Sequence, residues 1–575
     1  MARIRKVEIS NFRCIKQLTW LPDSGVNCLI GPGDTGKSTI LDAIDLCLGA
    51  RRSLQLTDAD FYRLDVENPI SITLTIGDLD DALKNIDSYG LYLRGFDPAT
   101  GTVEDEPEKD HEVVLTLSLT VEGDLEPEWC LVSDRARTQN SARGLVWSDR
   151  VRLSPTRIGA LAQANLGWRR GSVLNRLTDE KADATAALTK AARDARAAFG
   201  DDADSQLSST LTMVQDTAKD LGVAVGTRVR AMLDTHSVSF SGGTISLHTD
   251  EGVPLEGLGT GSTRLLIAGL QRKAAATASI VLADELEYGL EPHRIMRFLD
   301  SLGAKETQPP LQVFMTTHSP VALRELSGDQ LLIVREVAGE HQIMRLGSES
   351  DVQSAVRLYP EAFLSRTVLV CEGASEIGFV RGIDQWAYAN GYGSIAASGV
   401  ALVDCGGGDA DKPYTRALAF QRLGYRVGVL RDDDKKPSAE IERQFKDCGG
   451  AVFHWTNARA LEDELFLNLP ISAVGRLIDY AEQQHGDQQV DSQLRSESSN
   501  RVNLASVRHD LEMDALSLET RAFIAKASRK RRAGWFKSIT WMEEIAREIV
   551  GDALESSSGE LRNIVFDAFG WMHNA

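Results

Sequence analysis

The chain has 575 residues, of which 42% are hydrophobic and 25% charged, and its formal net charge at pH 7 is −20. This composition is that of an ordinary globular protein, and the length suits about three or four domains that each bury a core. The acidic balance excludes a surface covered with nucleic-acid-binding residues, since phosphate contacts need Lys and Arg, but it leaves room for a local basic patch.

Apolar stretches and cysteines indicate the compartment. No apolar run approaches the length of a membrane-spanning helix, and the first residues lead into a strand pattern and not into the apolar core of a signal peptide. The seven cysteines are scattered without a C-x-x-C pair, so we expect reduced thiols and neither a zinc site nor disulfides. We therefore expect a cytoplasmic protein with no membrane partner.

The first predicted elements surround a glycine-rich loop. Residues 3–20 alternate as in a strand, with a break at residues 11–13, and a short apolar strand at residues 26–30 runs into a sequence that matches G-x-x-x-x-G-K-[ST] before an apolar-periodic helix. In such a P-loop, backbone N–H groups surround phosphate oxygens, Lys37 adds positive charge near the β and γ phosphates, and Ser38 ligates Mg²⁺. The motif predicts binding of a nucleoside triphosphate. The predicted contact residues are Gly31, Gly33, Asp34, Gly36, Lys37, Ser38 and Thr39.

Strand patterns follow on both sides of a long helical stretch. Residues 70–76 and 113–121 alternate apolar residues with Thr and Ser, which predicts an antiparallel sheet beside the nucleotide core. Strand patterns resume at residues 238–247 and lead into a mixed α/β region. We therefore expect an ATPase domain in two parts, residues 1–153 and 236–346.

The intervening residues 154–235 have a helical pattern. One Ala-rich run covers residues 178–199 and a second run covers residues 207–221, both with a period near 3.6. Neither run has the sustained heptads of a long coiled coil. We expect a compact helical insertion that packs against another subunit and supports dimerisation.

Two further strand ends supply the residues that a P-loop ATPase needs. An apolar strand ends in Asp284 and Glu285, of which the first would hold Mg²⁺ through water and the second would activate the attacking water. Another apolar strand ends in His318, which is placed to sense a γ-phosphate. Upstream, a glycine-rich helix start suits an anion, because helix N-termini carry partial positive charge. Its predicted contact residues are Gly259, Gly261 and Ser262.

This order of motifs resembles the ABC-type ATPase heads of the RecF and SMC class. The resemblance implies that ATP is held between two subunits, with the glycine-rich signature of one closing over the P-loop of the other. Two features depart from the family pattern: the signature reads Leu258-Gly-Thr-Gly-Ser262 and not LSGGQ, and residues 290–293 replace the usual D-loop. No glutamine is assigned to the Q-loop.

A second α/β pattern occupies residues 347–575. Strand patterns at residues 367–371, 400–405 and 425–430 alternate with helical patterns, which predicts a parallel sheet. The polar residues 482–500 are expected to form a linker or loop before helices that continue to the end. The predicted fold class is thus α/β, with two different sheet-containing domains.

Acidic residues follow two of these strands. Glu372 and Glu376 come after the first, and Asp432 and Asp434 come after the third. Because the carboxyl ends of parallel strands share one edge of a sheet, the two pairs can converge there. Gathered carboxylates repel one another, so such a cluster implies Mg²⁺ or Mn²⁺. The alternative interpretation is a solvated turn at Asp432 to Asp434 and an ordinary helix cap at Glu372.

The E-G and D-x-D pairs resemble the Toprim fold, and an ABC ATPase followed by a Toprim domain resembles the OLD (overcoming lysogenization defect) family, which includes the nuclease subunit of the Gabija antiphage system. The resemblance implies a two-metal site that cuts DNA. Its implied metal ligands and catalytic acids are Glu372, Glu376, Asp432, Asp434 and Glu462. Lys537 stands where the family has a lysine that stabilises the transition-state phosphate, and Asp463 and Glu464 compete with Glu462 for its role.

The sequence therefore predicts an ATP-binding DNA endonuclease that depends on Mg²⁺ or Mn²⁺ and acts in antiphage defence. Expected partners are DNA and further copies of the chain, as a homodimer or a dimer of dimers, and a helicase-like partner stays open. The basic residues 526–537 would contact backbone phosphates. The alternative is a RecF/SMC-like repair ATPase or clamp with a non-catalytic Toprim domain. Either sign of control by ATP uses the same P-loop residues.

Overall fold

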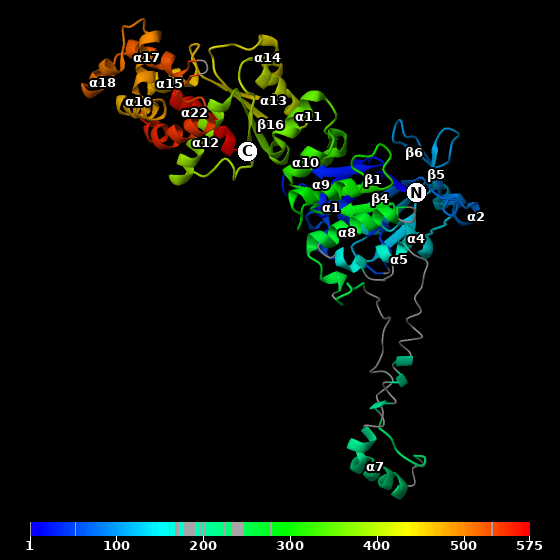
Figure 1. The fold of residues 1–575 in the computed structure, drawn as a ribbon. Coiled ribbons are helices and arrows are strands. Elements are labelled where there is room, and N and C mark those ends of the chain that lie inside the picture. Colours follow the sequence, from blue (N-terminus) through cyan, green and yellow to red (C-terminus); the bar gives the residue numbers. More distant parts are fainter. Residues whose placement is uncertain are drawn as a thin grey trace.

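A computed structural model describes most of the chain, and its ribbon is shown in Figure 1. The described residues are 2–574 without 52, 160–161, 167–171, 178–189, 192, 195–197, 200–202, 222–224, 232–246, 253, 276–278, 338 and 531–532. Helices and three sheets alternate along this part of the chain, so the predicted α/β class is confirmed. Within the same residues, no helix combines the length and the apolar character needed to cross a membrane.

The N-terminal sheet has seven strands in the order β2-β1-β4-β7-β5-β6, with β8 pairing to β7, and all these pairings are antiparallel. The strands are β1 (Arg3–Phe12), β2 (Ile15–Trp20), β4 (Ile70–Gly77), β5 (Leu93–Phe96), β6 (Val103–Glu104), β7 (Glu112–Val121) and β8 (Pro127–Leu131). The predicted antiparallel sheet is therefore confirmed. The predicted break at residues 11–13 is the turn between β1 and β2, where Asn11 and Arg13 have positive φ angles of 54° and 49°.

The second sheet carries the P-loop and has the order β13-β12-β3-β11-β10-β9. The strands are β3 (Val26–Ile30), β9 (Thr156–Arg157), β10 (Ile280–Ala283), β11 (Gln312–Thr316), β12 (Leu331–Val337) and β13 (Glu340–Arg345). Strands β3 and β9 to β12 are parallel, and only β13 runs antiparallel to its neighbour. Every residue of β3 is buried, which explains its continuous apolar run.

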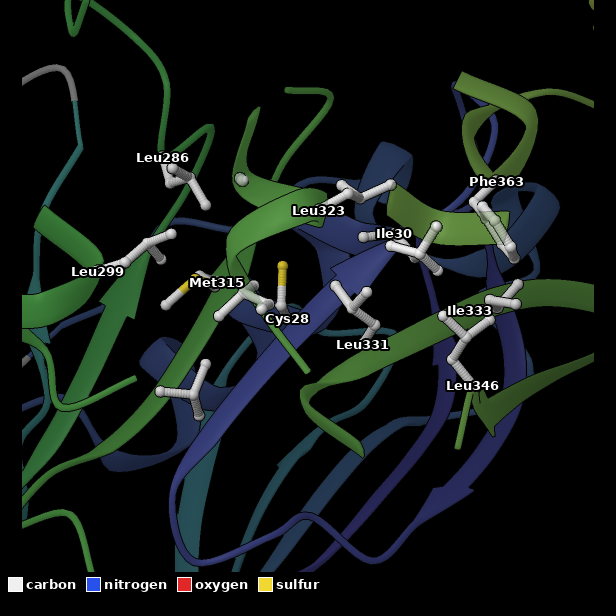
Figure 2. Close-up of a cluster of buried hydrophobic side chains, with 14 of the residues drawn as sticks. Cys28, Ile30, Leu286, Leu299, Met315, Leu323, Leu331, Ile333, Leu346 and Phe363 are labelled. Carbon is white, nitrogen blue, oxygen red and sulfur yellow. The ribbon is translucent and has the colours of Figure 1, made fainter. Parts of the chain in front are cut away.

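Helices cover the faces of this sheet. They include α1 (Lys37–Leu48), α8 (Thr260–Lys273), α9 (Pro292–Ser301) and α10 (Pro320–Glu325). Figure 2 shows how side chains of β3, β11, β12 and α10 meet, among them Cys28, Met315 and Leu323. The carboxyl ends of β3, β10 and β11 thereby share one edge of the sheet, directly before Gly31, Asp284 and Thr317.

The expected insertion is described in part. Helix α7 (Ser208–Asp220) lies within the second predicted run. In Figure 1 it stands apart from the first body, which contains the N-terminal and P-loop sheets, and from the C-terminal body, which contains the remaining sheet. Most of the run at residues 178–199 and of the strand pattern at residues 238–247 lies outside the described residues. The domain boundaries and the dimerising role of the insertion stay predictions.

The C-terminal sheet has four parallel strands in the order β15-β14-β16-β17. They are β14 (Thr367–Cys371), β15 (Val400–Asp404), β16 (Arg426–Arg431) and β17 (Ala451–His454), so the predicted parallel sheet is confirmed and gains one strand. The helices of this body include α12 (Ala374–Ala389), α13 (Lys412–Arg422), α14 (Ala439–Asp447), α15 (Leu461–Asn468), α16 (Ile471–His485), α17 (Asp487–Glu497), α18 (Leu504–Glu512), α19 (Leu518–Ser528), α20 (Ile539–Ile545) and α22 (Leu561–His573).

The linker predicted at residues 482–500 is wrong. These residues complete α16 and form α17, in which Val490 and Leu494 are fully buried. Two apolar residues four positions apart lie on one face of a helix, and here that face packs into the C-terminal core. The polar residues around them obscured this pattern.

The two bodies share one hydrophobic core, which extends from the P-loop sheet to β14, β16 and α13. The Arg335 guanidinium of β12 lies over the Tyr425 ring, 3.9 Å from its centroid. The Tyr425 hydroxyl, in turn, donates a hydrogen bond of 2.7 Å to the backbone oxygen of Phe363. Strand β12, which pairs with the P-loop strand, therefore also contacts the C-terminal body.

Candidate functional site

The P-loop has the backbone that its glycines predict. Gly31 and Gly36 have φ angles of 134° and 83°, and a Cβ atom on Gly36 would lie 3.0 Å from Cys14 Sγ. Such angles disfavour side chains. Lys37 Nζ donates to the backbone oxygens of Gly31 and Pro32, at 3.1 and 2.5 Å, which holds the ammonium group at the loop. Burial lowers the pKa of Lys37 to about 8.

The predicted magnesium ligands of the ATPase lie together. Ser38 Oγ donates to Asp284 Oδ1 at 3.0 Å across a separation of 246 residues. Thr316 Oγ1 donates to the same carboxylate oxygen at 2.7 Å, and an Arg157 nitrogen lies 3.7 Å from Asp284 Oδ2. A hydroxyl beside a carboxylate is a ligand pair that suits Mg²⁺. Sequence reasoning assigned no role to Thr316, although it lies in the strand that ends in His318, and it did not find Arg157, which belongs to no motif used for the prediction.

Glu285 follows in an unusual conformation. Its φ angle is 44°, its side chain is exposed, and its N–H donates to Thr316 Oγ1 at 2.8 Å. His318 is also exposed, and its backbone N–H donates to Glu287 Oε1 at 2.8 Å. Glu287 was not predicted, although it stands two residues after Glu285. It connects the strand end after β11 to the loop after β10, because Thr317 Oγ1 donates to its other oxygen.

The glycine-rich helix start lies at the N-terminus of α8. A Cβ atom on Gly261 would come within 2.1 Å of the Gly289 backbone oxygen, so the helix approaches the loop after β10 closely. Ser262 Oγ accepts a hydrogen bond of 3.1 Å from Arg294 Nη1. Among the described residues, no hydrogen bond or ion pair joins this helix start to Lys37 or Ser38.

The predicted acids of the C-terminal body also converge. The Asp432 N–H donates to Glu372 Oε2 at 3.0 Å, which joins the ends of β14 and β16. The Leu461 N–H donates to Asp432 Oδ1 at 3.0 Å, which brings the start of α15 to the same place. On α12, Glu376 accepts from the Gly373 N–H at 2.9 Å. The hydrogen bond between the two strand ends favours this convergence over the alternative of a solvated turn at Asp432 to Asp434 with a separate helix cap at Glu372.

Burial and mutual repulsion change the charge state of this acidic cluster, which consists of Glu372, Glu376, Asp432 and Glu462. Burial raises the pKa of Glu376 to about 8, and the Glu462 and Glu372 charges add to this effect. Burial also raises the pKa of Asp432 and of Glu462, while the Lys537 charge opposes the rise at Glu462. Nearby positive charge is therefore needed before the cluster can ionise fully.

Helix α15 presents three consecutive acids, and their contacts distinguish them. Asp463 pairs with Arg529 at 2.7 Å and accepts from the Ala460 N–H, and Glu464 accepts from the Asn468 amide. Glu462, by contrast, has an Oε1 atom that is buried and without a hydrogen-bond partner. A buried carboxylate oxygen without a donor suits a cation. The geometry thus favours Glu462 over its two neighbours.

Successive side chains of the D-x-D segment, residues 432–434, lie on opposite sides of the backbone. Asp433 is turned away from the cluster, where it accepts from the Ala458 N–H at 2.9 Å and pairs with Arg431. Asp434 is exposed, and its charge contributes to the raised pKa of Glu372. This alternation is the one predicted for an extended backbone.

One tight group of three ligand atoms lies outside both candidate sites. In the described part of the chain, ligand atoms of Glu104, Glu108 and His111 lie within 4.8 Å of one another. The carboxylates of the acidic cluster do not form such a group.

Several of the basic residues 526–537 and the aromatic residues beside them contact other parts of the protein. Trp535 and Phe536 are fully buried in the core and not available to nucleic acid. Two of the predicted phosphate-binding charges are already paired, Arg529 with Asp463 and Lys530 with Glu497. Lys537 is exposed beside the cluster, where its charge acts on Glu462.

The chain was compared with protein families, with curated proteins and with solved structures. A family profile described as "AAA domain, putative AbiEii toxin, Type IV TA system" matches residues 26–324. An OLD nuclease from Thermus scotoductus is 36% identical over 75 residues, which cover 12% of this chain and 14% of that protein. The DNA replication and repair protein RecF from Prosthecochloris aestuarii is 32% identical over 66 residues, covering 12% and 18% of the two chains. The chain thus matches less than a fifth of either relative's length.

Among solved structures, an SMC head bound to the C-terminal winged-helix domain of ScpA is similar with a TM-score of 0.35. It is 17% identical and covers 61% of this chain and 99% of that one. The profile match over residues 26–324 identifies an AAA-type ATPase domain in the first body.

Proposed function

The chain belongs to the AAA-domain family whose description names the AbiEii toxin of type IV TA systems, and from this premise we propose that its ATPase controls a DNA endonuclease in the C-terminal body. The nuclease depends on Mg²⁺ or Mn²⁺ and acts in antiphage defence, as in the OLD family and the Gabija system. The observation that carries the proposal is the buried, unpartnered Glu462 Oε1 among Glu372, Glu376 and Asp432.

The acidic cluster fits divalent ions by its donor set, since hard carboxylate oxygens are the ligands that Mg²⁺ and Mn²⁺ prefer. The residues that would hold two ions are Glu372, Glu376, Asp432, Asp434 and Glu462. Bound ions would supply Lewis acidity and a more acidic water at the phosphodiester. The exposed Lys537 ammonium would stabilise negative charge on the phosphate from the side of Glu462. This body would then be a Toprim domain.

The P-loop site of the first body would bind ATP. ATP would lie on the P-loop with Mg²⁺ held by Ser38 and Asp284, while Glu285 orients the attacking water and His318 faces the γ-phosphate. As the resemblance to the RecF and SMC class of heads implies, the glycine-rich start of α8 would close over the ATP of a second copy. The expected assembly is a homodimer or dimer of dimers on DNA, with a helicase-like partner as a further candidate.

Plasmid cleavage tests the nuclease. Purified protein with Mg²⁺ or Mn²⁺, with and without ATP, is expected to nick plasmid DNA, and Glu462→Gln and Asp434→Ala are expected to abolish nicking. Glu464→Gln is the matched control, because this neighbouring buried acid bonds to Asn468 and is expected to leave nicking intact. The lanes with ATP give the sign of control.

Thermal unfolding in the presence of Mg²⁺ or Mn²⁺ tests metal binding at the acidic cluster independently of nuclease activity. Saturating Mn²⁺ should stabilise the wild type and Glu464→Gln, by about 2.7 kcal/mol at a free concentration 100 times Kd. Glu462→Gln should lose most of this shift. Equal shifts in all three proteins would place the metal elsewhere.

A RecF/SMC-like DNA clamp is the second candidate, and the RecF match favours it. A clamp would retain DNA in an ATP-dependent manner and leave it intact in every metal.

A further inference from the structure

The Arg264 guanidinium of α8 is completely buried beneath the loop that carries Asp284 and Glu285. Nη1 donates to the backbone oxygens of Glu285 and Tyr288, at 3.0 and 2.8 Å. Nη2 donates to the backbone oxygens of Asp284 and Ile158, at 3.0 and 3.3 Å. Among the described ion pairs none includes this arginine, so backbone carbonyls and the Phe298 ring, 5.7 Å from Cζ, surround a buried cation.

Burying such a cation costs free energy, which the four hydrogen bonds of Nη1 and Nη2 offset, while the buried Nε has no hydrogen-bond partner. A planar guanidinium is the side chain that can reach several carbonyls at once. Three of the four carbonyls that it binds belong to Asp284, Glu285 and the loop that follows them, and the fourth belongs to Ile158 after β9. Arg264 itself is fully buried, so it cannot touch a nucleotide.

These hydrogen bonds help to hold Glu285 in an unusual backbone conformation. A φ angle of 44° is sparsely populated by residues other than glycine, and it persists only where the surroundings hold it. Thr316 holds the residue from one side, since its Oγ1 accepts the Glu285 N–H at 2.8 Å and its backbone oxygen accepts the Leu286 N–H at 3.0 Å. Arg264 holds the Glu285 carbonyl from the other side.

The first turn of α8 contacts the loop after β10 and helix α9 at two further points. Gly261 approaches the Gly289 backbone so closely that a Cβ atom would overlap it, and Ser262 accepts from Arg294 on α9. The glycine-rich helix start therefore packs directly against the segment that follows Asp284.

We propose that Arg264 is a positioning residue for ATP hydrolysis: it sets the backbone of Asp284 and Glu285 from within α8, and thereby makes their geometry depend on the glycine-rich helix start. This inference concerns the ATPase and holds whether or not the C-terminal body cuts DNA. A group that binds at the start of α8 changes hydrolysis through Arg264, without contact to Glu285.

Arg264→Lys and Arg264→Gln test the proposal in the full-length chain, with ATP hydrolysis and nucleotide affinity measured separately. Lysine keeps the charge but cannot reach all four carbonyls. We expect kcat to fall on the order of 100-fold in both variants, as for other small displacements of catalytic groups, while ATP affinity changes little. Arg272→Gln is the matched control, because this exposed arginine on α8 contacts Asp300 and Glu306 outside the site.

A double-mutant cycle gives the sharper test. If Arg264 acts through Glu285, then Arg264→Lys should lower the residual kcat of a Glu285→Gln protein by much less than it lowers that of the wild type. A wild-type kcat in Arg264→Lys overturns the proposal. So do additive effects in the cycle, or a loss of ATP affinity and Tm that parallels the loss of kcat, since these outcomes describe a structural arginine. If the Arg264→Gln protein does not fold, the Arg264→Lys protein and the double-mutant cycle still test the proposal.

Discussion

Burial affects single charged residues in opposite ways at the two candidate sites. At the P-loop it lowers the pKa of a lysine, and in the acidic cluster it raises the pKa of carboxylates. Both shifts favour the neutral form in the absence of a partner. A ligand of opposite charge would restore the charged form at each site, as the proposed polyphosphate would at Lys37 and the proposed divalent cations would at Glu376 and Glu462.

Lys37 leads to a prediction about pH. Because its pKa is about 8 in the free protein, the ammonium form is lost as pH rises through that value. ATP affinity is therefore expected to fall between pH 7 and 9, and binding above pH 8 should take up a proton. Nucleotide titration calorimetry in two buffers of different ionisation enthalpy measures both quantities. Affinity that stays constant to pH 9 without proton uptake would contradict the lowered pKa.

At the scale of elements, short polar segments differ from what their composition indicates. Helix α17 contains few apolar residues, yet Val490 and Leu494 enter the same core as Trp535 and Phe536. The indole N–H of Trp535 also donates to Gln493 on this helix. The segment expected to be a linker therefore helps to position the chain next to Lys537.

Leu494→Ala tests this role of α17. Removing a fully buried leucine should destabilise the protein by about 2–5 kcal/mol, because a cavity remains where the side chain packed. Gln489→Ala is the control, since this exposed residue of the same helix should change stability by about 0.5 kcal/mol or less. Denaturant unfolding followed by tryptophan fluorescence measures both. Equal, small effects would mean that α17 is not part of the folded core.

At the scale of the whole molecule, the contact between the bodies determines how they respond to one another. Strand β12 pairs with the P-loop strand and carries Arg335 to the Tyr425 ring of the C-terminal body. The rings of Phe363 and Phe420 also contact Tyr425, with centroids at 6.1 and 5.5 Å. One shared core predicts that the two bodies unfold together.

The substitution Tyr425→Ala should uncouple the unfolding of the two bodies. The substitution removes a buried ring and its hydrogen bond to Phe363, at a cost of about 3–5 kcal/mol. In scanning calorimetry we expect the main transition to divide into two, whereas Tyr388→Ala, at a residue that is 70% exposed, should leave it unchanged. A single transition at lower temperature would show that other contacts suffice to couple the bodies.

Local patterns allowed much of the fold to be predicted. The strands β4, β7, β14, β15 and β16 lie where alternating or continuous apolar residues indicated them, because strand periodicity is encoded in neighbouring residues. Strand β17 was missed, since its four half-buried residues resemble a loop. The helix α17 was missed because two apolar residues are too few to show a period.

The sequence by itself determined the P-loop, the order of the ATPase motifs and the acids at two strand ends, since each depends on a few adjacent residues. Only the tertiary structure decided which distant groups meet: Ser38 with Asp284, and Asp432 with Glu372. It also decided that Glu462, and neither adjacent acid, has a free buried oxygen, and that Arg264 lies beneath Glu285. These contacts depend on the packing of elements far apart in the chain, which no local pattern encodes.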